Sequence, residues 1–556
     1  MLVPKALPDT SQRNSSSQKP ADQISWLFGG LSAAELLPKL QQYLLAQDAT
    51  ANWQLVWLNN DGRPVIGLLP KVGWSVYPAN NRESDKPLPY YKVVKNLRNN
   101  GNAIMTTNMS YMEWQDELIN YSQAYENDHS TAKPTNKKND HSSYHHGLMG
   151  FISYDMAACE LSPAANIKLA AQPCAVLGHY DIYLTAIDTD TELSSWSLNV
   201  IKTKQTGDNE PNEKTLNLLI SYLNKLDAKL SGKDKPTATL APLTLRARWH
   251  KEDYQHAFEK TQHYLQQGDC YQINLTQAWQ NQFTYKKDHE AVAALIDYLP
   301  ALQYSTQAPF AGYMNIQALG GSFDKNSTFS KYGEHSSFEL LSCSPELFFT
   351  FAKEHKTGKH HIRTKPIKGT RPRGSNTEQD LILGQQLMTS DKDRAENVMI
   401  VDLLRNDLGR YAKTGSVKVP HLFSIESFSN VHHMVSTITA ELAKDAHPLA
   451  VLFGSLPAGS ITGTPKKRAV EIISELEVAP RGAYCGTMGY MNFDGSGQWN
   501  VLIRTLQAQH LVDESSKTTK VSLWAGGGIT IASKCSDEYQ ESFDKVSNLL
   551  TVLETI

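Results

Sequence analysis

The sequence predicts a mixed α/β protein, because segments with strand-like and helix-like patterns alternate along the chain. Residues 54–58 form an apolar run that ends in Asn59-Asn60-Asp61-Gly62, which predicts a strand followed by a turn. Residues 250–267 carry apolar side chains at helical spacing and are followed by Gly268, which predicts a helix and its end. Residues 271–276 alternate like a half-buried strand. Both kinds of element are therefore expected on either side of residue 240, where we place a domain boundary.

Composition limits the functions that this chain can have. Its 556 residues are 40% hydrophobic and 20% charged, which is typical of a soluble globular protein of several domains. A net charge of −3 argues against binding to nucleic acid or to a membrane surface. The 6 cysteines form no CxxC pair, as expected for reduced thiols. No run is long and apolar enough for a signal peptide or a membrane helix, so we expect a cytoplasmic protein.

The chain divides into two regions and two insertions. Residues 1–24 are polar and predict a disordered tail. The first region spans 25–240, and within it residues 122–146 form a His-, Asn- and Lys-rich stretch that predicts a mobile insertion. Its histidines could bind a metal ion adventitiously, but composition favours a solvated loop. The second region, 241–556, is expected to carry the chemistry and contains another surface insertion at 321–337.

Three further elements are expected in the first region. Residues 150–155 predict a strand, and residues 175–184 predict further strands. Residues 213–230 predict a helix that leads into a linker over 231–239.

The stretch 364–374 is the first candidate for chemistry. It reads Thr-Lys-Pro-Ile-Lys-Gly-Thr-Arg-Pro-Arg-Gly and predicts a strand that ends in a tight turn around Lys368. Pro366 and Pro372 fix φ on either side, and Gly369 permits a positive φ. Such framing suits a catalytic lysine, because a lysine must be desolvated to act as a neutral nucleophile. A salt-bridged lysine in a basic turn fits this stretch equally well.

Glu346 is a candidate general acid. It lies between Pro345 and an apolar strand, a position that suits a carboxyl group with a raised pKa. The alternative is an exposed glutamate at the start of a strand.

A helix that begins at Ser390 supplies another carboxylate. Glu396 shares one face with Ile400 and Leu403, so it points at the packed side of the helix. An unpaired carboxylate there would cost several kcal/mol, so we expect a cation beside it. Residues 402–410 are dense in opposite charges, for which we expect salt bridges and capping rather than catalysis.

Residues 456–466 form a Gly-, Ser- and Thr-rich loop that enters a helix, with Pro465 at the first helical position. Free N–H groups at a helix N-terminus can bind an anion. The order of residues is not that of a Walker A loop, so a carboxylate is as plausible a ligand as a phosphate.

The last candidate stretch follows Gly526-Gly527-Gly528 and carries Glu538, Glu541 and Lys545 on a helix. A solvated Glu541–Lys545 pair, which would stabilise the helix by ~0.3–0.5 kcal/mol, is the simpler interpretation. Together with Glu396, the two glutamates would instead form an all-carboxylate site for Mg²⁺.

These stretches, in this order, resemble the chorismate-utilising enzymes. The resemblance is strong from about residue 245 to 553 and weaker before it, around Gly150 to Asp155. It rests on the segments 268–274, 344–346, 364–374, 402–410, 431–436, 481–484 and 503–505 and on the triple glycine. It implies an α/β (α+β) fold of two intertwined subdomains that form a sandwich of antiparallel β-sheets with helices on the outside.

The resemblance also implies an activity. Pro366-Ile367-Lys368-Gly369-Thr370 is similar to the aminodeoxychorismate branch, whereas anthranilate synthases have alanine in place of the lysine. Lys368 is then expected to attack C2 of chorismate while Glu346 protonates the leaving C4 hydroxyl. Ammonia would then attack C4 and expel the lysine from C2. The amide nitrogen of glutamine would be the source of that ammonia, and 4-aminobenzoate and folate would be the later products.

Each site residue takes a role from the same resemblance. The implied catalytic residues are Lys368, Glu346, Thr370 and His433. The implied substrate-binding residues are Gly369, Tyr484, Arg504, Gly527, Gly528 and Lys545. The implied ligands of Mg²⁺ are Glu396, Glu538 and Glu541.

Partners and alternatives complete the expectations. No cysteine lies in a nucleophile-elbow context, so a separate glutamine amidotransferase subunit (component II) is expected to supply ammonia. The family's tryptophan pocket is matched by Pro309, Phe310 and Ala311, although asparagines 59 and 60 stand where a serine is usual. The alternatives are an isochorismate or salicylate synthase, an anthranilate synthase, or a non-catalytic tryptophan-binding subunit.

Overall fold

The computed structural model describes residues 24–47, 54–79, 90–98, 104–126, 143–187, 195–201, 213–231, 240–286, 294–317, 337–354, 356–427, 431–512 and 516–556. The tail predicted over 1–24 and the insertion predicted over 321–337 lie almost entirely outside these residues, as does the linker over 231–239. No helix in the described part of the chain has the length and apolar character needed to cross a membrane.

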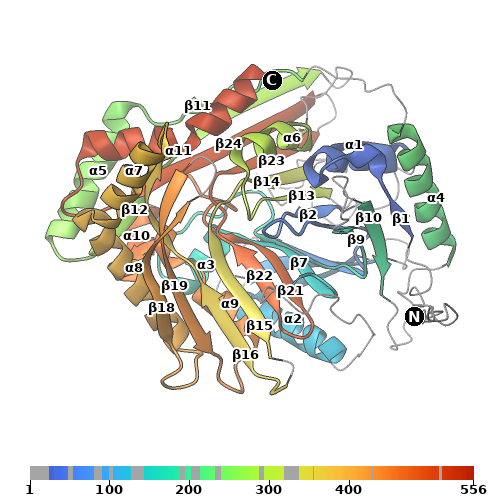
Figure 1. Ribbon diagram of the computed structural model, residues 1–556, viewed down its shortest axis with the longest axis horizontal. Coiled ribbons are helices and arrows are strands. Elements are labelled where there is room, and N and C mark those ends of the chain that lie inside the picture. The colour runs from blue at the N-terminus through green and yellow to red at the C-terminus, as the bar shows by residue number, and fades with distance from the viewer. Residues whose placement is uncertain are drawn as a thin grey trace, which may run out of the picture.

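The first of two antiparallel sheets joins strands from both regions of the chain (Figure 1). The strands before residue 240 gather at one end of the sheet, and β2 pairs with β13 from beyond that residue. In spatial order the strands are β1 (Ser25–Trp26), β10 (Ser195–Val200), β9 (Ile182–Ile187), β3 (Val65–Gly67), β2 (Val56–Leu58), β13 (Gly312–Gln317), β14 (Ser337–Ser342), β23 (Thr505–Val512), β24 (Ser516–Ile529), β12 (Gln272–Lys286) and β11 (Arg246–Ala247), with β20 (Gly463–Thr464) paired to β12.

The second sheet is built in the same way. It places β7 from the first region beside β21 from the second. In spatial order the strands are β17 (Ile367–Pro372), β19 (Val431–Glu441), β16 (His360–Thr364), β15 (Leu347–Lys353), β22 (Gly497–Asn500), β21 (Thr487–Asn492), β7 (Gly147–Ile152), β8 (Ala175–His179), β4 (Val72–Pro78), β5 (Tyr90–Leu97) and β6 (Ile104–Ser110), with β18 (Lys418–Ser427) paired to β19. Because each sheet contains strands from before and after residue 240, the two regions are interleaved in space.

A buried apolar layer holds the two sheets face to face. Val56 and Leu340 of the first sheet share one core with Phe151, Val176 and Met488 of the second. Each such side chain stabilises the fold by ~1.5–3 kcal/mol when it leaves water. The predicted sandwich of antiparallel sheets is confirmed.

Helices cover the outer faces of both sheets. Successive residues of a strand point to opposite sides of its sheet, so each strand also presents side chains to this outer layer. Each sheet forms an outer core with its own helices. The first sheet packs with α1 (Ala33–Gln47), α4 (Glu213–Leu230), α6 (Leu295–Thr306) and α11 (Cys535–Thr555), and the second with α2 (Tyr111–Glu126), α3 (Tyr154–Leu161), α8 (Asp391–Gly409) and α9 (Pro448–Ser455). The others are α5 (Lys251–Gln266), α7 (Thr377–Met388), α10 (Lys466–Leu476), and the short 3-10 helices η1 (Phe28–Gly30) and η3 (Gly459–Ile461).

Two helices agree closely with the sequence prediction. Helix α4 has the predicted bounds. Helix α5 ends beside Gly268, whose φ of +81° stops the helix. Its buried residues are the predicted stripe of Tyr254, Ala257, Phe258, Thr261 and Leu265. Helical periodicity was therefore a sufficient signal for the packed face of α5.

Strand predictions needed two corrections. Strand β12 was expected to be half-buried, but residues 272–279 are buried on both faces because helices and the second layer cover them. The strand predicted over 150–155 ends at Ile152, and Tyr154 and Asp155 belong to α3 instead. Ser153 caps that helix by accepting a hydrogen bond from the Met156 N–H.

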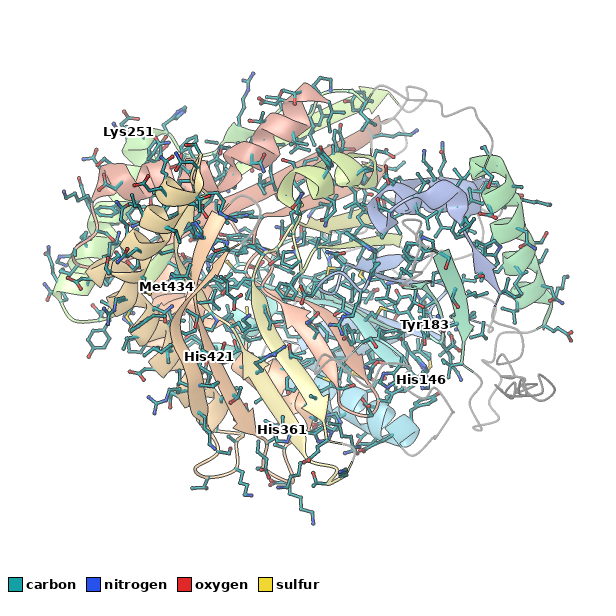
Figure 2. The ribbon with its side chains drawn as sticks, viewed as in Figure 1. His146, Tyr183, Lys251, His361, His421 and Met434 are labelled. Atoms are coloured by element: carbon teal, nitrogen blue, oxygen red, sulfur yellow. The ribbon has the colours of Figure 1, made fainter. Side chains whose placement is uncertain are left out.

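The insertion predicted over 122–146 is too wide. Helix α2 continues to Glu126, and Tyr144 and His146 are buried. His146, labelled in Figure 2, lies with its Nε2 2.9 Å from Nε2 of His179, so it is not a solvated loop residue. Residues 127–142, which include His129 and His141, lie outside the described part of the chain.

Candidate active site

Lys368 lies in an irregular part of β17. The pairing of β17 with β19 shifts register between Ile367 and Thr370, so Lys368 and Gly369 form a bulge inside the strand. The prediction that the strand ends there in a tight turn was wrong, because pairing resumes and continues to Pro372. Gly369 has a φ of +81°, and a Cβ there would come within 2.7 Å of Leu387 Cδ1, so only glycine fits.

Three carboxylates lie close enough to the half-buried Lys368 side chain to feel its charge. Its positive charge acts on Glu346, Glu396 and Glu541, and in each case it lowers the pKa of the carboxyl group. These glutamates come from the start of β15, from α8 and from α11. The fold therefore gathers around one amine the acidic side chains that the sequence had marked separately.

Glu346 has the environment expected of a general acid. It is 7% exposed, and the Ser460 hydroxyl donates a hydrogen bond of 3.0 Å to its Oε1. Burial raises the pKa of Glu346 above its ordinary value, although Lys368, the Ser460 hydroxyl and Lys545 oppose that effect. The carboxyl group therefore holds its proton to higher pH than an exposed glutamate does.

Thr370 and His433 face each other across the β17–β19 pair. Their side chains are joined by a hydrogen bond of 2.9 Å between Oγ1 and Nδ1. Burial and the nearby charge of Arg504 lower the pKa of His433 to about 4. The imidazole is therefore neutral near pH 7 and can exchange hydrogen bonds without carrying charge.

Tyr484 and Arg504 lie on connections between strands. Tyr484 is buried and stacks on Trp524, with ring centroids 6.0 Å apart. Arg504 has a φ of +50°, a conformation that costs ~1–3 kcal/mol for a residue with a side chain and that is concentrated at functional sites. Burial lowers the pKa of Arg504. The desolvated guanidinium would gain strongly from an anionic partner.

The triple glycine of β24 borders the carboxylates of α11. A Cβ at Gly527 would lie 2.8 Å from Glu538 Oε2 and 3.5 Å from Glu541 Oε1. On Gly528, a Cβ would collide with the side-chain amide of Gln272. A side chain at either position would therefore collide with a glutamate of α11 or with Gln272, so this part of the strand requires glycine.

The expected metal ligands share their surroundings with two lysines. Lys392 Nζ lies 4.0 Å from Glu396 Oε1 and 3.8 Å from Glu538 Oε1, so it joins α8 to α11. Lys545 Nζ lies 2.6 Å from Glu541 Oε1 and donates to the Gly526 carbonyl at 2.8 Å. The cation expected beside Glu396 is therefore present as Lys392, together with Lys368.

The donor set is chemically suitable for a hard divalent cation. Burial raises the pKa values of Glu396 and Glu538, and the nearby charge of Glu541 adds to both shifts. A cation would relieve that repulsion, and the carboxylates of Glu538 and Glu541 both lie against Gly527. Within the described residues, however, no three His, Cys, Asp or Glu side chains come close enough together to hold a metal ion.

The charged end of α8 is paired as expected. Arg405 contacts Asp402 at 2.7 Å on the surface, and Lys466 contacts Asp407 at 2.7 Å in a buried position. The salt bridges predicted at residues 402–410 are confirmed for these pairs. Asp407 also ties α8 to the start of α10.

A comparison with known families agrees with this geometry. A model of the chorismate binding enzyme family matches residues 90–551. This chain belongs to that family. The match includes every carboxylate and lysine described above.

Several chorismate binding enzymes of known name are similar in sequence to this chain. Aminodeoxychorismate synthase component 1 of Klebsiella aerogenes is 37% identical over 418 residues, which cover 73% of this chain and 82% of that protein. The protein of the same name from Escherichia coli is 41% identical over 315 residues, covering 56% and 60%. Anthranilate synthase component 1 of Aquifex aeolicus is 31% identical over 419 residues, covering 73% and 74%.

A solved structure shows the same fold. Anthranilate synthase component I from Streptococcus pneumoniae superposes with a TM-score of 0.60 at 20% identity, covering 96% of this chain and all of that one (100%). At that identity the likeness concerns the chorismate binding fold alone.

Three residues at this site escaped the sequence predictions. Lys392 lies one helical turn before Glu396, so i,i+4 spacing could have revealed it. Ser460 was seen only as part of a loop, and its contact with Glu346 spans 114 positions. Gln272 is fully buried, and both polar atoms of its amide lack a partner among the described residues. No sequence signal marked that amide, because a strand residue gives no sign of its hydrogen bonds.

The segments expected to form a tryptophan pocket do meet. The Asn59 side chain donates to the carbonyls of Ala308 and Pro309 at 3.0 and 3.3 Å, and its N–H donates to that of Ala311 at 2.9 Å. Asn60 is 4% exposed, and its side-chain amide has no partner among the described residues. A buried amide of this kind is available to a polar ligand.

Proposed function

We propose that this chain is an aminodeoxychorismate synthase component 1, which converts chorismate and ammonia into 4-amino-4-deoxychorismate for 4-aminobenzoate and folate synthesis. The observation that carries the proposal is the placement of Lys368 in a bulged strand, where its charge acts on Glu346, Glu396 and Glu541. Relatives named aminodeoxychorismate synthase component 1 support it at 37 and 41% identity.

The proposed chemistry has two displacements. The Lys368 amine bonds to C2 of chorismate, the two conjugated ring double bonds shift, and the C4–O bond breaks as Glu346 gives its proton to the departing hydroxyl. Water leaves, and the lysine nitrogen loses one proton. Ammonia then bonds to C4 and loses a proton, and the two double bonds shift back. The C2–N bond breaks with its electron pair on nitrogen, which takes up a proton as Lys368 is released. Two displacements preserve the ring geometry at C4.

The remaining site residues bind and orient the substrate in this proposal. Arg504 and Tyr484, with N–H groups near Gly527 and Gly528, would hold the enolpyruvyl carboxylate. Thr370, His433 and Gly369 would line the ring. Lys545 would lie near the ring carboxylate.

Mg²⁺ is the proposed cofactor. Glu396, Glu541 and Glu538 would hold it, and when bound it would neutralise the charge of the ring carboxylate. The donor chemistry, with the carboxylates of Glu538 and Glu541 both against Gly527, supports this assignment.

Ammonia is proposed to come from a glutamine amidotransferase subunit, in the cytoplasm. The names of the relatives, which end in component 1, support the existence of a partner component. Chorismate turnover that uses glutamine only when such a subunit is added would support this partnership.

Product identity tests the function directly. Purified protein is given chorismate, Mg²⁺ and ammonium, and the product is separated and identified by mass spectrometry, before and after a 4-aminobenzoate-forming lyase is added. We expect aminodeoxychorismate and then 4-aminobenzoate. Anthranilate, isochorismate or salicylate as the main product would replace the proposal with another branch of the family, and no turnover would favour a non-catalytic subunit.

A tryptophan site is a second, separate proposal. The unpartnered Asn60 amide beside Pro309, Phe310 and Ala311 favours a polar ligand there. Calorimetric titration with tryptophan should show saturable binding that is lost in Asn60→Leu, with phenylalanine as the control ligand. Equal heats from both amino acids would contradict a specific site.

A further inference from the structure

The loop from Gly459 to Gly463 is rigidly anchored behind the site. The Ile461 carbonyl accepts hydrogen bonds from the Asn274 amide at 2.8 Å and from Arg481 Nη1 at 3.0 Å. Arg481 is 2% exposed, and its Nε and Nη2 donate to the two carboxylate oxygens of Glu477 at 2.7 Å each. A buried bidentate pair of this kind is held in one geometry. The loop therefore has little freedom to move.

This anchoring fixes Ser460 against the candidate acid. The Ser460 hydroxyl donates to Glu346 Oε1 at 3.0 Å, the one hydrogen bond that this carboxylate accepts among the described residues. The backbone of Glu346 is fixed from the other side, because its N–H donates to Ser344 Oγ at 3.2 Å and its carbonyl accepts from the Val501 N–H at 3.0 Å. The orientation of the carboxyl group therefore depends on Ser460.

The loop is also tied to the helix that carries Glu396. A Cβ on Gly459 would collide with the Leu403 side chain of α8, so the loop backbone packs directly against that side chain. Lys466, just after the loop, donates to Asp407 of α8 at 2.7 Å and to the Ser455 carbonyl at 3.0 Å. Ser460 thus holds Glu346 in a fixed relation to the other acidic residues.

We propose that Ser460 is the positioning residue of the general acid. By donating to Oε1 it leaves Oε2 to carry the proton, so the acidic O–H has one direction. In the reaction that proton passes to the C4 hydroxyl oxygen of the substrate, the C4–O bond breaks with its electron pair on oxygen, and water departs. Glu346 is left as a carboxylate that Ser460 still holds. This inference rests on the proposed function, in which Glu346 is the acid.

Infrared difference spectra of the free protein give a test that does not depend on turnover. The carboxylic C=O band of Glu346 is assigned by its loss in Glu346→Gln and is followed with pH. In Ser460→Ala the band should move to higher wavenumber and persist to higher pH, because the lost hydrogen bond had stabilised the carboxylate. Ser460→Thr, which keeps the hydroxyl, should restore both properties.

Thr462→Val is the matched control in the same loop. The Thr462 hydroxyl donates to the Ala458 carbonyl at 2.7 Å and does not touch Glu346. We expect Thr462→Val to lower thermal stability without moving the Glu346 band. An unmoved band in Ser460→Ala, or an equal shift in Thr462→Val, would overturn the proposal.

Kinetics separate this inference from the proposed function. If wild-type protein forms aminodeoxychorismate, Ser460→Ala should lower kcat by about tenfold with little change in KM, as expected when a hydrogen bond to a charged group is lost. The alkaline limb of its pH profile should move to higher pH. If wild type forms no such product, the proposed function fails, while the infrared band still decides whether Ser460 orients Glu346.

Discussion

The pKa values of individual side chains at this site depend on burial and on the charges near Lys368. Burial raises the pKa values of Glu346 and Glu396. The pKa of Glu541 is lowered instead, because the charge and the hydrogen bond of Lys545 outweigh the effect of burial. His433 is held neutral, with a pKa of about 4. The site therefore combines buried carboxyl groups, a neutral imidazole and an amine in one region of mixed charge.

Replacement of Lys368 should remove most of the turnover. In Lys368→Ala, ammonia-dependent turnover of chorismate should fall by ~10³-fold or more, because no lysine amine remains to bond to C2 and release the C4 hydroxyl. Rates are measured from the product by chromatography, and wild-type protein trapped during turnover should carry a covalent adduct by mass spectrometry.

Lys365→Ala is the control for that variant, since Lys365 pairs with Glu426 at 2.6 Å rather than with the acidic cluster. It should keep near wild-type rates. Unchanged turnover in Lys368→Ala would show that Lys368 is not the nucleophile.

Glu346→Gln should lower the activity and raise the stability of the protein at alkaline pH. Turnover should drop by ~10²–10⁴-fold through loss of the acid. The pKa of Glu346 is raised in the folded state, so the folded protein binds more protons and wild-type stability falls as pH rises from the unfolded value through the folded one. The glutamine variant lacks that loss of stability. Its melting temperature should therefore be higher than that of wild type at pH 8 and equal to it near pH 4. Scanning calorimetry at both pH values measures this, and a lower melting temperature at pH 8 would contradict it.

At the scale of elements, the site depends on how α8 and α11 meet. Glu396 lies on α8 and Glu538 on α11, and Lys392 Nζ lies within 4.0 Å of a carboxylate oxygen of each. In the proposed function a divalent cation would take over the role of Lys392 between the two helices.

Lys392→Met should therefore bind Mg²⁺ more tightly. Removal of a competing cation should lower the Kd by about two- to tenfold, a modest effect because Lys392 is well exposed. Calorimetric titration with Mg²⁺, or electron paramagnetic resonance with Mn²⁺, measures the affinity without any turnover. Lys392→Arg retains the charge and should behave like wild type. Weaker binding in Lys392→Met would mean that the lysine positions the carboxylates rather than competes with the metal.

At the scale of the whole molecule, buried polar contacts lock the two regions together. Asp155 of α3 accepts hydrogen bonds from the Ala170 and Gly482 N–H groups, both on Oδ2 at 3.0 Å. Tyr154 carries the Arg481 guanidinium over its ring at 4.6 Å. Residues separated by more than 300 positions thus form one buried polar centre behind the Ser460 loop.

Asp155→Asn should remove a pH-dependent cost. Burial raises the pKa of Asp155 from 3.8 to about 7, so wild-type stability is lost as pH rises through that range. Asparagine can keep both hydrogen bonds on its side-chain oxygen. At pH 8 the variant should be more stable by as much as ~4 kcal/mol, since one pKa unit corresponds to ~1.4 kcal/mol. Urea unfolding at pH 8 and pH 4 measures it, and an equal difference at both pH values would exclude titration of Asp155 as the cause.

Local patterns were enough for part of this protein. The apolar stripe of α5 and the bounds of α4 followed from periodicity, because a helix face repeats within a few residues. The order of motifs around Glu346, Lys368, Glu396 and the triple glycine was enough to indicate the family, which the match over residues 90–551 confirms. Residue chemistry also marked the acid and the amine before their positions were known.

Tertiary structure alone decided how those groups meet. The bulge at Lys368 arises from pairing with β19, and the burial of both faces of β12 arises from layers contributed by distant segments. Ser460 reaches Glu346, and Lys392 reaches Glu538, only because the chain returns to the same place. Periodicity reports contacts between near neighbours in sequence, whereas burial, charge pairing and pKa values depend on neighbours in space. The candidate groups were therefore readable from the sequence, and their shared environment was a property of the fold.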